Sequence, residues 1–463
     1  MAARAYNHQL EYDITWQEQI YLTEFPNWTA ESDQAGSVFG SAVGTAGDVN
    51  DDGYSDVIIG AHEYDNGQSG EGRVFVYYGE ANGLAQTPGW TAESDQLGAH
   101  FGLSVGTAGD VNGDGYSDVI VGAPYGGGGM SPGQAYVYYG SASGLSSAAN
   151  WMVTGDQDGA NFGWAVGTAG DVNGDNYDDV IVSSLDYDNG QSHEGRVFVY
   201  HGAAAGLSTN PAWMVESNLD YAGFGQSVGT AGDVNGDGYA DVIIGAPGYD
   251  NVASNEGRAY VYHGAASGLS LTPDWTVESG EYGARLGESV GTAGDVNGDG
   301  YSDIVIGAPN YNVGEGRAYV YHGTASGLLT SPAWTADGGQ DDPNFGASVG
   351  TAGDTDGDNY DEVIVGAYDF NNGQLSEGGA FVFYGAAGGL PATPSWTAES
   401  DQLGAYLGQA VGKAGDVNDD GYADVIIGAP GYSNGQISEG RAYVYHGTAS
   451  ESLIYLPLLT RRP

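Results

Sequence analysis

A nonapeptide of the form D-x-(N/D)-x-D-(G/N)-Y-x-(D/E) occurs seven times in this chain, at intervals of 59 to 62 residues. A fixed period of this length is typical of repeat architectures, in which each unit buries its apolar face against its neighbours. Acidic side chains at alternate positions repel one another unless a cation lies among them. The repeat therefore predicts seven similar units, each with a metal-binding loop. The loops begin at Asp48, Asp110, Asp171, Asp233, Asp295, Asp354 and Asp416.

Each unit contains four short segments that are typical of β-strands. In the fourth unit they are QSVGT (226–230), DVIIGAP (241–247), GRAYVYHG (257–264) and DWTVES (274–279), with no segment of helical period and length. Four strands in each of seven units predict an all-β fold, a seven-bladed β-propeller of four-stranded antiparallel blades with calcium loops. A linear solenoid could use similar units, but radial blades bury their faces against neighbours and leave only short edges.

Aromatic residues recur with the same period, which favours one core solution copied around a ring. A tryptophan marks the expected fourth strand, and a tyrosine or phenylalanine marks the third. The tryptophans are Trp28, Trp90, Trp151, Trp213, Trp275, Trp334 and Trp396, and the rings of the third strand are Tyr77, Tyr138, Tyr200, Tyr262, Tyr321, Phe383 and Tyr445.

Two short motifs accompany the acidic loops. A Phe-Gly pair stands at residues 39–40, 101–102, 162–163, 224–225 and 345–346, with Leu-Gly at 286–287 and 407–408. Gly-Ala-Pro stands at 122–124, 245–247, 307–309 and 428–430 and varies in the other units. On these motifs the chain resembles the FG-GAP repeat family, the seven-bladed propeller of integrin alpha subunits and many bacterial surface proteins. The resemblance covers about residues 25–447. It implies innermost strands that start at Phe-Gly, with calcium between the first and second strands of each blade.

Up to seven Ca²⁺ ions are the expected cofactors, because Ca²⁺ takes six to eight oxygen ligands and accepts flexible all-protein shells better than Mg²⁺ does. We assign side-chain oxygens at loop positions one, three and five, the backbone carbonyl at position seven, and a carboxylate at position nine, expected to be bidentate. The predicted metal ligands are Asp48, Asn50, Asp52, Tyr54, Asp56, Asp110, Asn112, Asp114, Tyr116, Asp118, Asp171, Asn173, Asp175, Tyr177, Asp179, Asp233, Asn235, Asp237, Tyr239, Asp241, Asp295, Asn297, Asp299, Tyr301, Asp303, Asp354, Asp356, Asp358, Tyr360, Glu362, Asp416, Asn418, Asp420, Tyr422 and Asp424.

A hairpin turn is the alternative interpretation of these loops, because Asn-Gly and Asp-Gly are strong turn signals. That alternative does not explain why carboxylates return at the first, fifth and ninth positions. The sixth loop departs from the others, with Asp356 at the third position and Glu362 at the ninth. Its additional charge would tighten binding, whereas the longer glutamate would disturb the geometry, and the sequence leaves both effects open.

Composition restricts the partners of this chain. The formal net charge is −51, which disfavours nucleic acid and anionic membrane surfaces as partners. No apolar segment reaches transmembrane length, so we expect no membrane insertion. The chain contains no cysteine, so calcium loops would take the place of disulfides as cross-links. The acidity suits water rich in divalent cations and favours an extracellular or cell-surface location.

The sequence indicates no active site, and we expect no enzyme activity. His201, His263, His322 and His446 share one repeat position, which tyrosine fills in other units, so they are interpreted as packing or hydrogen-bonding groups. The arginines of the EGR motif are interpreted as scaffold partners of nearby acids. His62, His100, His193, Trp164, Arg285 and Lys413 break the repeat but are scattered over different units in the sequence.

The chain ends supply more strand-like sequence than seven blades need. We divide the chain into an N-terminal extension (1–24) and the propeller (25–463), in which 448–463 form a closing strand or tail. The default is that the segment around Trp28 closes blade seven, but Leu458 also falls in the repeat frame. The alternating segment 10–24 could fold back on its own ring or pair with the next molecule, and such head-to-tail donation generates filaments.

The leading hypothesis is a non-enzymatic, extracellular structural or adhesive protein that could polymerise head to tail. The alternative is a ligand-binding module resembling an integrin head, which would grip an extracellular protein or glycan through the loops at 62–71, 124–133, 185–194 and 247–256. A propeller hydrolase or lyase is the third hypothesis.

Overall fold

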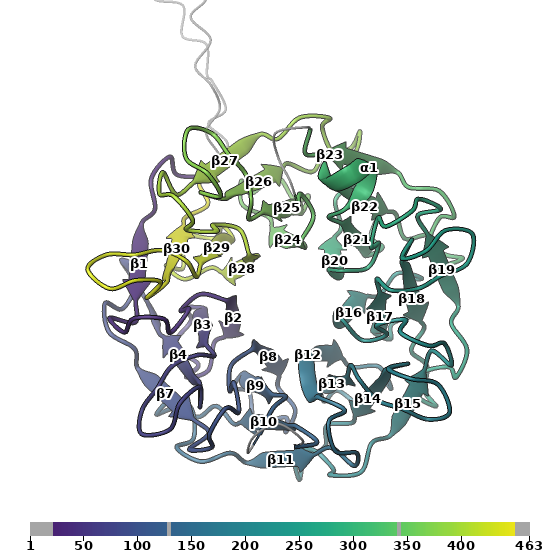
Figure 1. Cartoon of the computed structure of the whole chain (residues 1–463), viewed down its shortest axis with the longest axis horizontal. Coiled ribbons are helices and arrows are strands. Elements are labelled where there is room, and N and C mark those ends of the chain that lie inside the picture. The colour runs from purple at the N-terminus through teal and green to yellow at the C-terminus, as the bar shows by residue number, and fades with distance from the viewer. Residues whose placement is uncertain (1–21, 127–130, 340–343, 450–463) are drawn as a thin grey trace, which may run out of the picture.

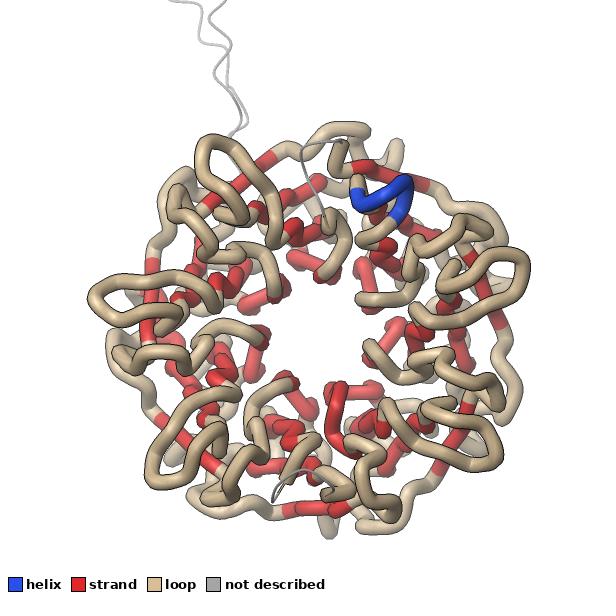
Figure 2. The backbone as a smooth tube through the Cα atoms, viewed as in Figure 1, coloured by secondary structure: helices blue, strands red, loops and turns tan. Residues whose placement is uncertain are grey.

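The computed structural model of the chain describes residues 22–126, 131–339 and 344–449. Within these ranges, seven four-stranded antiparallel sheets lie around a central opening, as Figure 1 shows. Figure 2 shows that the strands form radial stacks and that loops project from them. The predicted seven-bladed β-propeller is confirmed.

In each blade, the four strands are ordered from the central opening to the outer rim. Blade one contains β2 (Ala42–Gly47), β3 (Asp56–Ala61), β4 (Arg73–Tyr77) and β7 (Trp90–Glu93). Blade two contains β8 (Ser104–Gly109), β9 (Asp118–Ala123), β10 (Gln134–Tyr138) and β11 (Trp151–Thr154). Blade three contains β12 (Phe162–Gly170), β13 (Asp179–Ser184), β14 (Arg196–Tyr200) and β15 (Trp213–Glu216). Blade four contains β16 (Val228–Gly232), β17 (Asp241–Ala246), β18 (Arg258–Tyr262) and β19 (Trp275–Glu278).

The remaining blades follow the same order. Blade five contains β20 (Val290–Gly294), β21 (Asp303–Ala308), β22 (Arg317–Tyr321) and β23 (Trp334–Asp337). Blade six contains β24 (Ser348–Gly353), β25 (Glu362–Ala367), β26 (Gly379–Phe383) and β27 (Trp396–Glu399). Blade seven contains β28 (Ala410–Gly415), β29 (Asp424–Ala429), β30 (Arg441–Tyr445) and β1 (Trp28–Glu31). Outside the blades lie a small hairpin, β5 (Gly79–Glu80) with β6 (Gly83–Leu84), and the single turn α1 (Tyr311–Gly314), which contains two left-handed residues.

The N-terminal strand β1 closes the ring by pairing with β30 from the other end of the chain. Its register places Trp28 opposite Val444 and Glu31 opposite Arg441. Leu22, at the end of the predicted extension, is fully buried and bridges to Gly447. The rest of the predicted extension, residues 1–21, and Leu458 lie outside the described residues.

The apolar core lies between blades rather than within them. One cluster, for example, joins Val197 and Trp213 of blade three to Val242 and Tyr260 of blade four. The seven repeated tryptophans each pack edge-on against an aromatic ring of the next blade, at centroid distances of 4.7 to 5.0 Å. Each indole N–H also donates a hydrogen bond to a backbone carbonyl, such as that of Ser270 for Trp213 at 2.7 Å. Every blade is therefore fastened to its successor by the same aromatic contact.

The Phe-Gly motif forms a second junction between blades. Phe39 of blade one makes a parallel bridge with Gly440 of blade seven, and equivalent bridges recur around the ring. Gly40 is left-handed, and a Cβ there would lie 2.7 Å from the carbonyl oxygen of Arg441. The innermost strand starts at the motif only in blade three among the described residues, so the implied strand start is wrong for the other blades. In those blades, the Phe-Gly or Leu-Gly segment lies against the preceding blade, and the innermost strand begins a few residues later.

Trp213→Ala should lower the free energy of unfolding by about 3–5 kcal/mol, because it opens a cavity between blades three and four. Met214→Ala is the matched control: its side chain is 45% exposed, so the expected change is within about 0.5 kcal/mol. Urea denaturation followed by far-ultraviolet circular dichroism measures both. Equal midpoints for the two variants would contradict the role of the tryptophan as an inter-blade fastener.

Candidate metal centres and a candidate binding pocket

Each acidic loop curls around the carboxylate of its first residue. In the second loop, Asp110 Oδ1 accepts the amides of Gly113 (2.7 Å) and Asp114 (3.1 Å), and Oδ2 accepts the amide of Gly115 (2.9 Å). Asn112 Oδ1 accepts the Asp114 amide at 2.9 Å. These bonds order the loop around the side-chain oxygens of positions one, three and five, which the sequence analysis assigned as metal ligands.

The carboxylate at position nine has a structural role. Asp118 is fully buried, and its two oxygens accept the amides of Val111 (3.1 Å) and Gly140 (2.9 Å). Burial, together with the charges of Asp114 and Asp110, raises the pKa of Asp118 to about 7, against the lowering effect of its two backbone hydrogen bonds. Since a carboxylate oxygen has two lone pairs, each oxygen retains one for a cation. Asp118, the predicted bidentate ligand, therefore also joins the loop to the residues that follow the third strand of the blade. This structural role was not predicted from the sequence.

The sixth loop gathers the most negative charge. The carboxylate oxygens of Asp354, Asp356, Asp358 and Glu362 lie within 4.8 Å of one another. Burial raises the pKa of Glu362 to about 9, with help from the neighbouring charges. Buried carboxylates held this close are strongly destabilised in their charged form unless a cation or a proton compensates them.

Two loop oxygens lack a protein partner among the residues that the structure describes. They are Asn297 Oδ1 at position three of the fifth loop and Glu362 Oε1 at position nine of the sixth. Both atoms are buried, and both belong to the ligand set assigned from the sequence. An all-oxygen donor set with orphaned acceptors fits Ca²⁺, which takes carboxylate, amide and backbone oxygens.

Backbone hydrogen bonds link the seven loops into a closed circle. The carbonyl oxygen of each loop's first residue accepts the amide of the eighth residue in the following loop. Asp48 O accepts the amide of Ser117 at 3.0 Å, and Asp416 O returns the circle to blade one by accepting the amide of Ser55 at 2.8 Å. The same bond forms at all seven junctions, at 2.8 to 3.2 Å. The order of one loop is therefore transmitted directly to the next.

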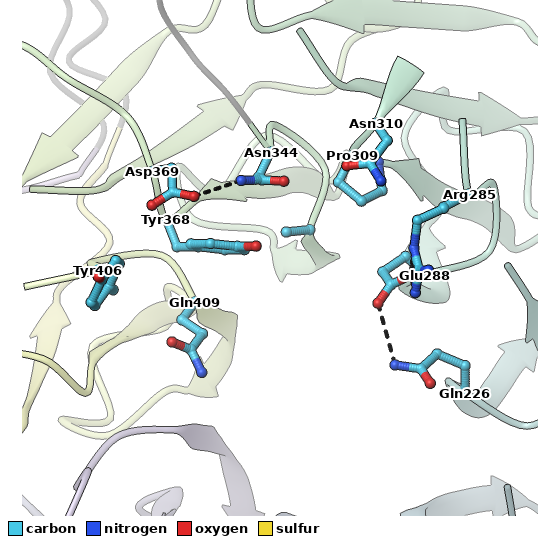
Figure 3. A pocket seen from close by; sticks show the side chains of 11 residues that line it. Gln226, Arg285, Glu288, Pro309, Asn310, Asn344, Tyr368, Asp369, Tyr406 and Gln409 are labelled. Carbon is cyan, nitrogen blue, oxygen red and sulfur yellow. Dashed lines mark hydrogen bonds and ion pairs between the residues drawn. The ribbon is translucent and has the colours of Figure 1, made fainter. Parts of the chain in front are cut away.

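A polar pocket of about 810 Å³ lies among blades four to seven (Figure 3). Arg285 and Glu288 form an ion pair on one side, with a nitrogen–oxygen distance of 2.6 Å. On the other side, Asn344 Nδ2 donates to Asp369 Oδ2 at 2.7 Å. The lining is completed by Gln226, Pro309, Asn310, Ala347, Tyr368, Tyr406 and Gln409. These residues precede or follow Phe-Gly, or stand at or just after the proline of Gly-Ala-Pro, and their types change from blade to blade.

The variable loops named from the sequence lie beside this pocket only in part. Loops 185–194 and 247–256 line a neighbouring cavity of about 280 Å³, through residues such as Asp186, His193 and Asn255. The pocket of Figure 3 was missed because its residues come from six separate segments and no single loop carries them. The sequence signal that these pocket residues share is that the residue type changes from blade to blade at fixed positions of the repeat.

The central channel is lined by the innermost strands. Glycine and threonine of every blade surround a cavity of about 270 Å³, except that Lys413 replaces the threonine of blade seven. This lining is uniform and offers few reactive groups.

The repeated arginines and histidines occupy scaffold positions. Arg196, Arg258, Arg317 and Arg441 form ion pairs with an acid on the adjacent outer strand and lie over a tyrosine ring. Arg73 instead donates to the hydroxyls of Thr91 and Tyr64. The repeat-position histidines are half-buried or buried, and His201, His263 and His446 lie against a glycine of the next blade.

The off-repeat residues are not all scattered, as the sequence suggested. His62 of blade one and His100 of the segment entering blade two stack with ring centroids 5.6 Å apart. Arg285 enters the polar pocket.

Comparison with known proteins agrees with this architecture. The FG-GAP repeat profile matches residues 39–77, 101–138, 162–200, 224–262, 286–321 and 407–445, one segment in each blade except the sixth. The chain is an FG-GAP repeat protein. It is 32% identical to integrin alpha-4 of Xenopus laevis over 45% of this chain and 20% of the relative. It is 33% identical to integrin alpha-PS2 of Drosophila melanogaster over 42% of this chain and 16% of the relative.

A second kind of relative covers more of the repeat array. Phosphatidylinositol-glycan-specific phospholipase D of Bos taurus is 29% identical over 70% of this chain and 42% of the relative. This FG-GAP repeat protein thus spans less than half of these relatives' lengths. In the part of the chain covered by the structure, no helix is long and apolar enough to cross a membrane.

If the loops hold Ca²⁺, replacing one ligand should remove one site and lower stability. At a calcium concentration 100 times the dissociation constant, each site contributes about 2.7 kcal/mol. Asp114→Asn should therefore lower the melting temperature in calcium and narrow the gap between melts in calcium and in EDTA. Asp95→Asn is the matched control, because Asp95 is exposed, has a left-handed backbone that asparagine tolerates, and lies outside the loops. Melts that do not respond to EDTA would contradict a structural role for calcium.

Proposed function

We propose that this FG-GAP repeat protein is a calcium-stabilised binding and adhesion module that acts outside the cell or at the cell surface, without catalytic activity of its own. The observation that carries the proposal is the contrast between two sets of positions. The acidic loops are nearly uniform and joined in a circle, whereas the residues around the pocket of Figure 3 differ from blade to blade. Uniform loops suit a scaffold, and variable loop residues suit recognition.

Calcium in this proposal is bound by the residues assigned from the sequence, up to seven ions in all. Their support is the oxygen-only donor set, the orphaned acceptors of Asn297 and Glu362, and the carboxylate cluster of the sixth loop. With calcium bound, the buried carboxylates are compensated and the loop circle is rigid. Millimolar calcium outside cells would keep weak sites occupied.

The pocket offers both charges and aromatic faces to a ligand. Arg285 and Asp369 supply opposite charges, and Tyr368 and Tyr406 lie with ring centroids 6.3 Å apart. Such a mixture suits a polar segment of a protein or a glycan, which binds through hydrogen bonds and ring stacking. The similarity to integrin alpha chains supports a protein-binding role.

Hydrolysis is the competing proposal, because one relative is a phospholipase D by name. The uniform lining of the central channel and the packing of the repeated histidines against glycines support the proposal of a module without catalytic activity. Hydrolysis of phosphatidylinositol-glycan by the purified chain, abolished by changing one off-repeat residue, would favour the enzyme.

The binding proposal predicts a pocket-dependent ligand. Tyr406→Ser should weaken calcium-dependent binding on arrays of glycans and extracellular-matrix proteins by about tenfold, the cost of one lost aromatic contact. Tyr282→Ser is the matched control, because Tyr282 is 81% exposed and does not line the pocket. Equal binding by the two variants would contradict the proposal that the ligand contacts this pocket.

Self-assembly through the chain ends is proposed as a separate property. The described part of the chain supplies its own closing strand β1, so residues 1–21 and 450–463 are not needed to complete blade seven. Their sequence in 10–21 still carries the alternating apolar pattern of a strand that could be donated to a neighbour.

Deleting residues 1–21 while keeping Leu22 should convert any filaments into folded monomers with an unchanged calcium response. Light scattering and negative-stain electron microscopy of both proteins at high concentration measure this. Full-length protein that stays monomeric under these conditions would contradict donation, and it would leave the binding proposal unaffected.

A further inference from the structure

Two histidines that break the repeat converge with a neighbouring glutamate at the junction of blades one and two. The three residues are His62, Glu63 and His100, whose ligand atoms all lie within 4.8 Å of one another. His100 Nδ1 lies 3.7 Å from Glu63 Oε1, and the two imidazole rings stack. We infer that these residues form a binding site for a borderline divalent transition metal ion, with Zn²⁺ as the best fit, distinct from the oxygen-only calcium loops.

The blade scaffold does not require histidine at either position. The place of His62 is held by proline in four blades, at Pro124, Pro247, Pro309 and Pro430. The place of His100, just before Phe-Gly, is held by asparagine at Asn161 and Asn344. Its backbone is left-handed at His100 (φ 53°), as it is at these asparagines, and asparagine adopts this conformation more readily than histidine. Proline at position 62 and asparagine at position 100 are therefore compatible with the blade scaffold.

The donor set favours zinc over calcium. Two imidazoles and one carboxylate are the ligand types that Zn²⁺ accepts, and three protein ligands leave a coordination position for water or another ligand. Hard cations such as Ca²⁺ take oxygen ligands and gain little from imidazole nitrogen. All three side chains are half-buried, with 26% of the His100 side chain exposed, so an ion can reach them from solvent.

A hydrogen bond with Ser41 leaves one ring nitrogen of His62 for metal binding. His62 Nδ1 lies 2.8 Å from Ser41 Oγ, which fixes the ring and leaves Nε2 for an ion.

Two neighbouring residues pack against the cluster. Gly70 lies against it, and a Cβ there would be 3.4 Å from Glu63 Oε2 and 3.5 Å from His100 Nε2. Tyr125 packs edge-on against His100, at a centroid distance of 5.0 Å. An ion bound here would join blade one to blade two through side chains, in addition to the backbone bonds of the ring.

The test is calorimetric titration of the full chain with ZnCl₂ in saturating calcium, so that the acidic loops are already filled. We expect one zinc ion per chain. His62→Pro and His100→Asn restore the residues that the repeat uses elsewhere, so the folded ring should survive, and each should remove this binding event. Ser41→Ala should weaken zinc binding by roughly 10–100-fold, since it releases the orienting hydrogen bond.

His193→Asn is the matched control. His193 also lies beside a carboxylate, 3.1 Å from Asp186 Oδ1, but it stacks on Tyr221 rather than on a second histidine, and its substitution should leave zinc binding unchanged. A readout without variants is the nuclear magnetic resonance of the histidine rings, where zinc should shift two rings together. Wild-type protein that binds no zinc, variants of His62 and His100 that bind it as tightly as wild type, or ring signals that stay in place would overturn the inference.

Discussion

The circle of hydrogen bonds between successive acidic loops is the constraint on which the rest of the structure depends. Each loop accepts, through its first backbone carbonyl, an amide from the next loop, and the last bond runs from Asp416 to Ser55. Hydrogen bonds to the carboxylate of the first residue hold each loop in a curled shape, and in the sixth loop the curl brings four carboxylates within 4.8 Å of one another. Electrostatic repulsion within a loop therefore opposes the geometry that closes the ring, and a divalent cation would relieve it.

Most of the fold could be predicted from the sequence because the motifs of one blade recur seven times along the chain. The nonapeptide and the repeated tryptophans predicted the blade number, the four strands of each blade and blade faces buried against neighbours. The contact of Trp213 and its six counterparts with an aromatic ring of the next blade was found only in the structure. The structural role of the ninth-position carboxylate was harder to predict, because its hydrogen bonds to Val111 and Gly140 join two segments that are far apart in the sequence. The segment around Trp28 was the default prediction for the closing strand, with Leu458 as a second candidate in the repeat frame, and the pairing of β1 with β30 confirms the default.

The candidate sites outside the loops could not be predicted for a related physical reason. The pocket of Figure 3 and the cluster of His62, Glu63 and His100 both use positions next to Phe-Gly and Gly-Ala-Pro. In the sequence, His62 and His100 are far apart; in the ring, Phe-Gly crosses to the preceding blade and brings them together. The same crossing gives the fold a rim where residues can vary without disturbing the loops or the aromatic contacts, and there new binding properties can arise.

The central claim is that divalent cations compensate the seven curled loops. Crystals grown in calcium, with data collected at a wavelength where calcium scatters anomalously, test it most directly. The account predicts seven anomalous peaks, one in each loop, at about 2.3–2.6 Å from oxygens of positions one, three, five, seven and nine. Loops that keep this curled shape with no anomalous peak among their carboxylates would contradict it.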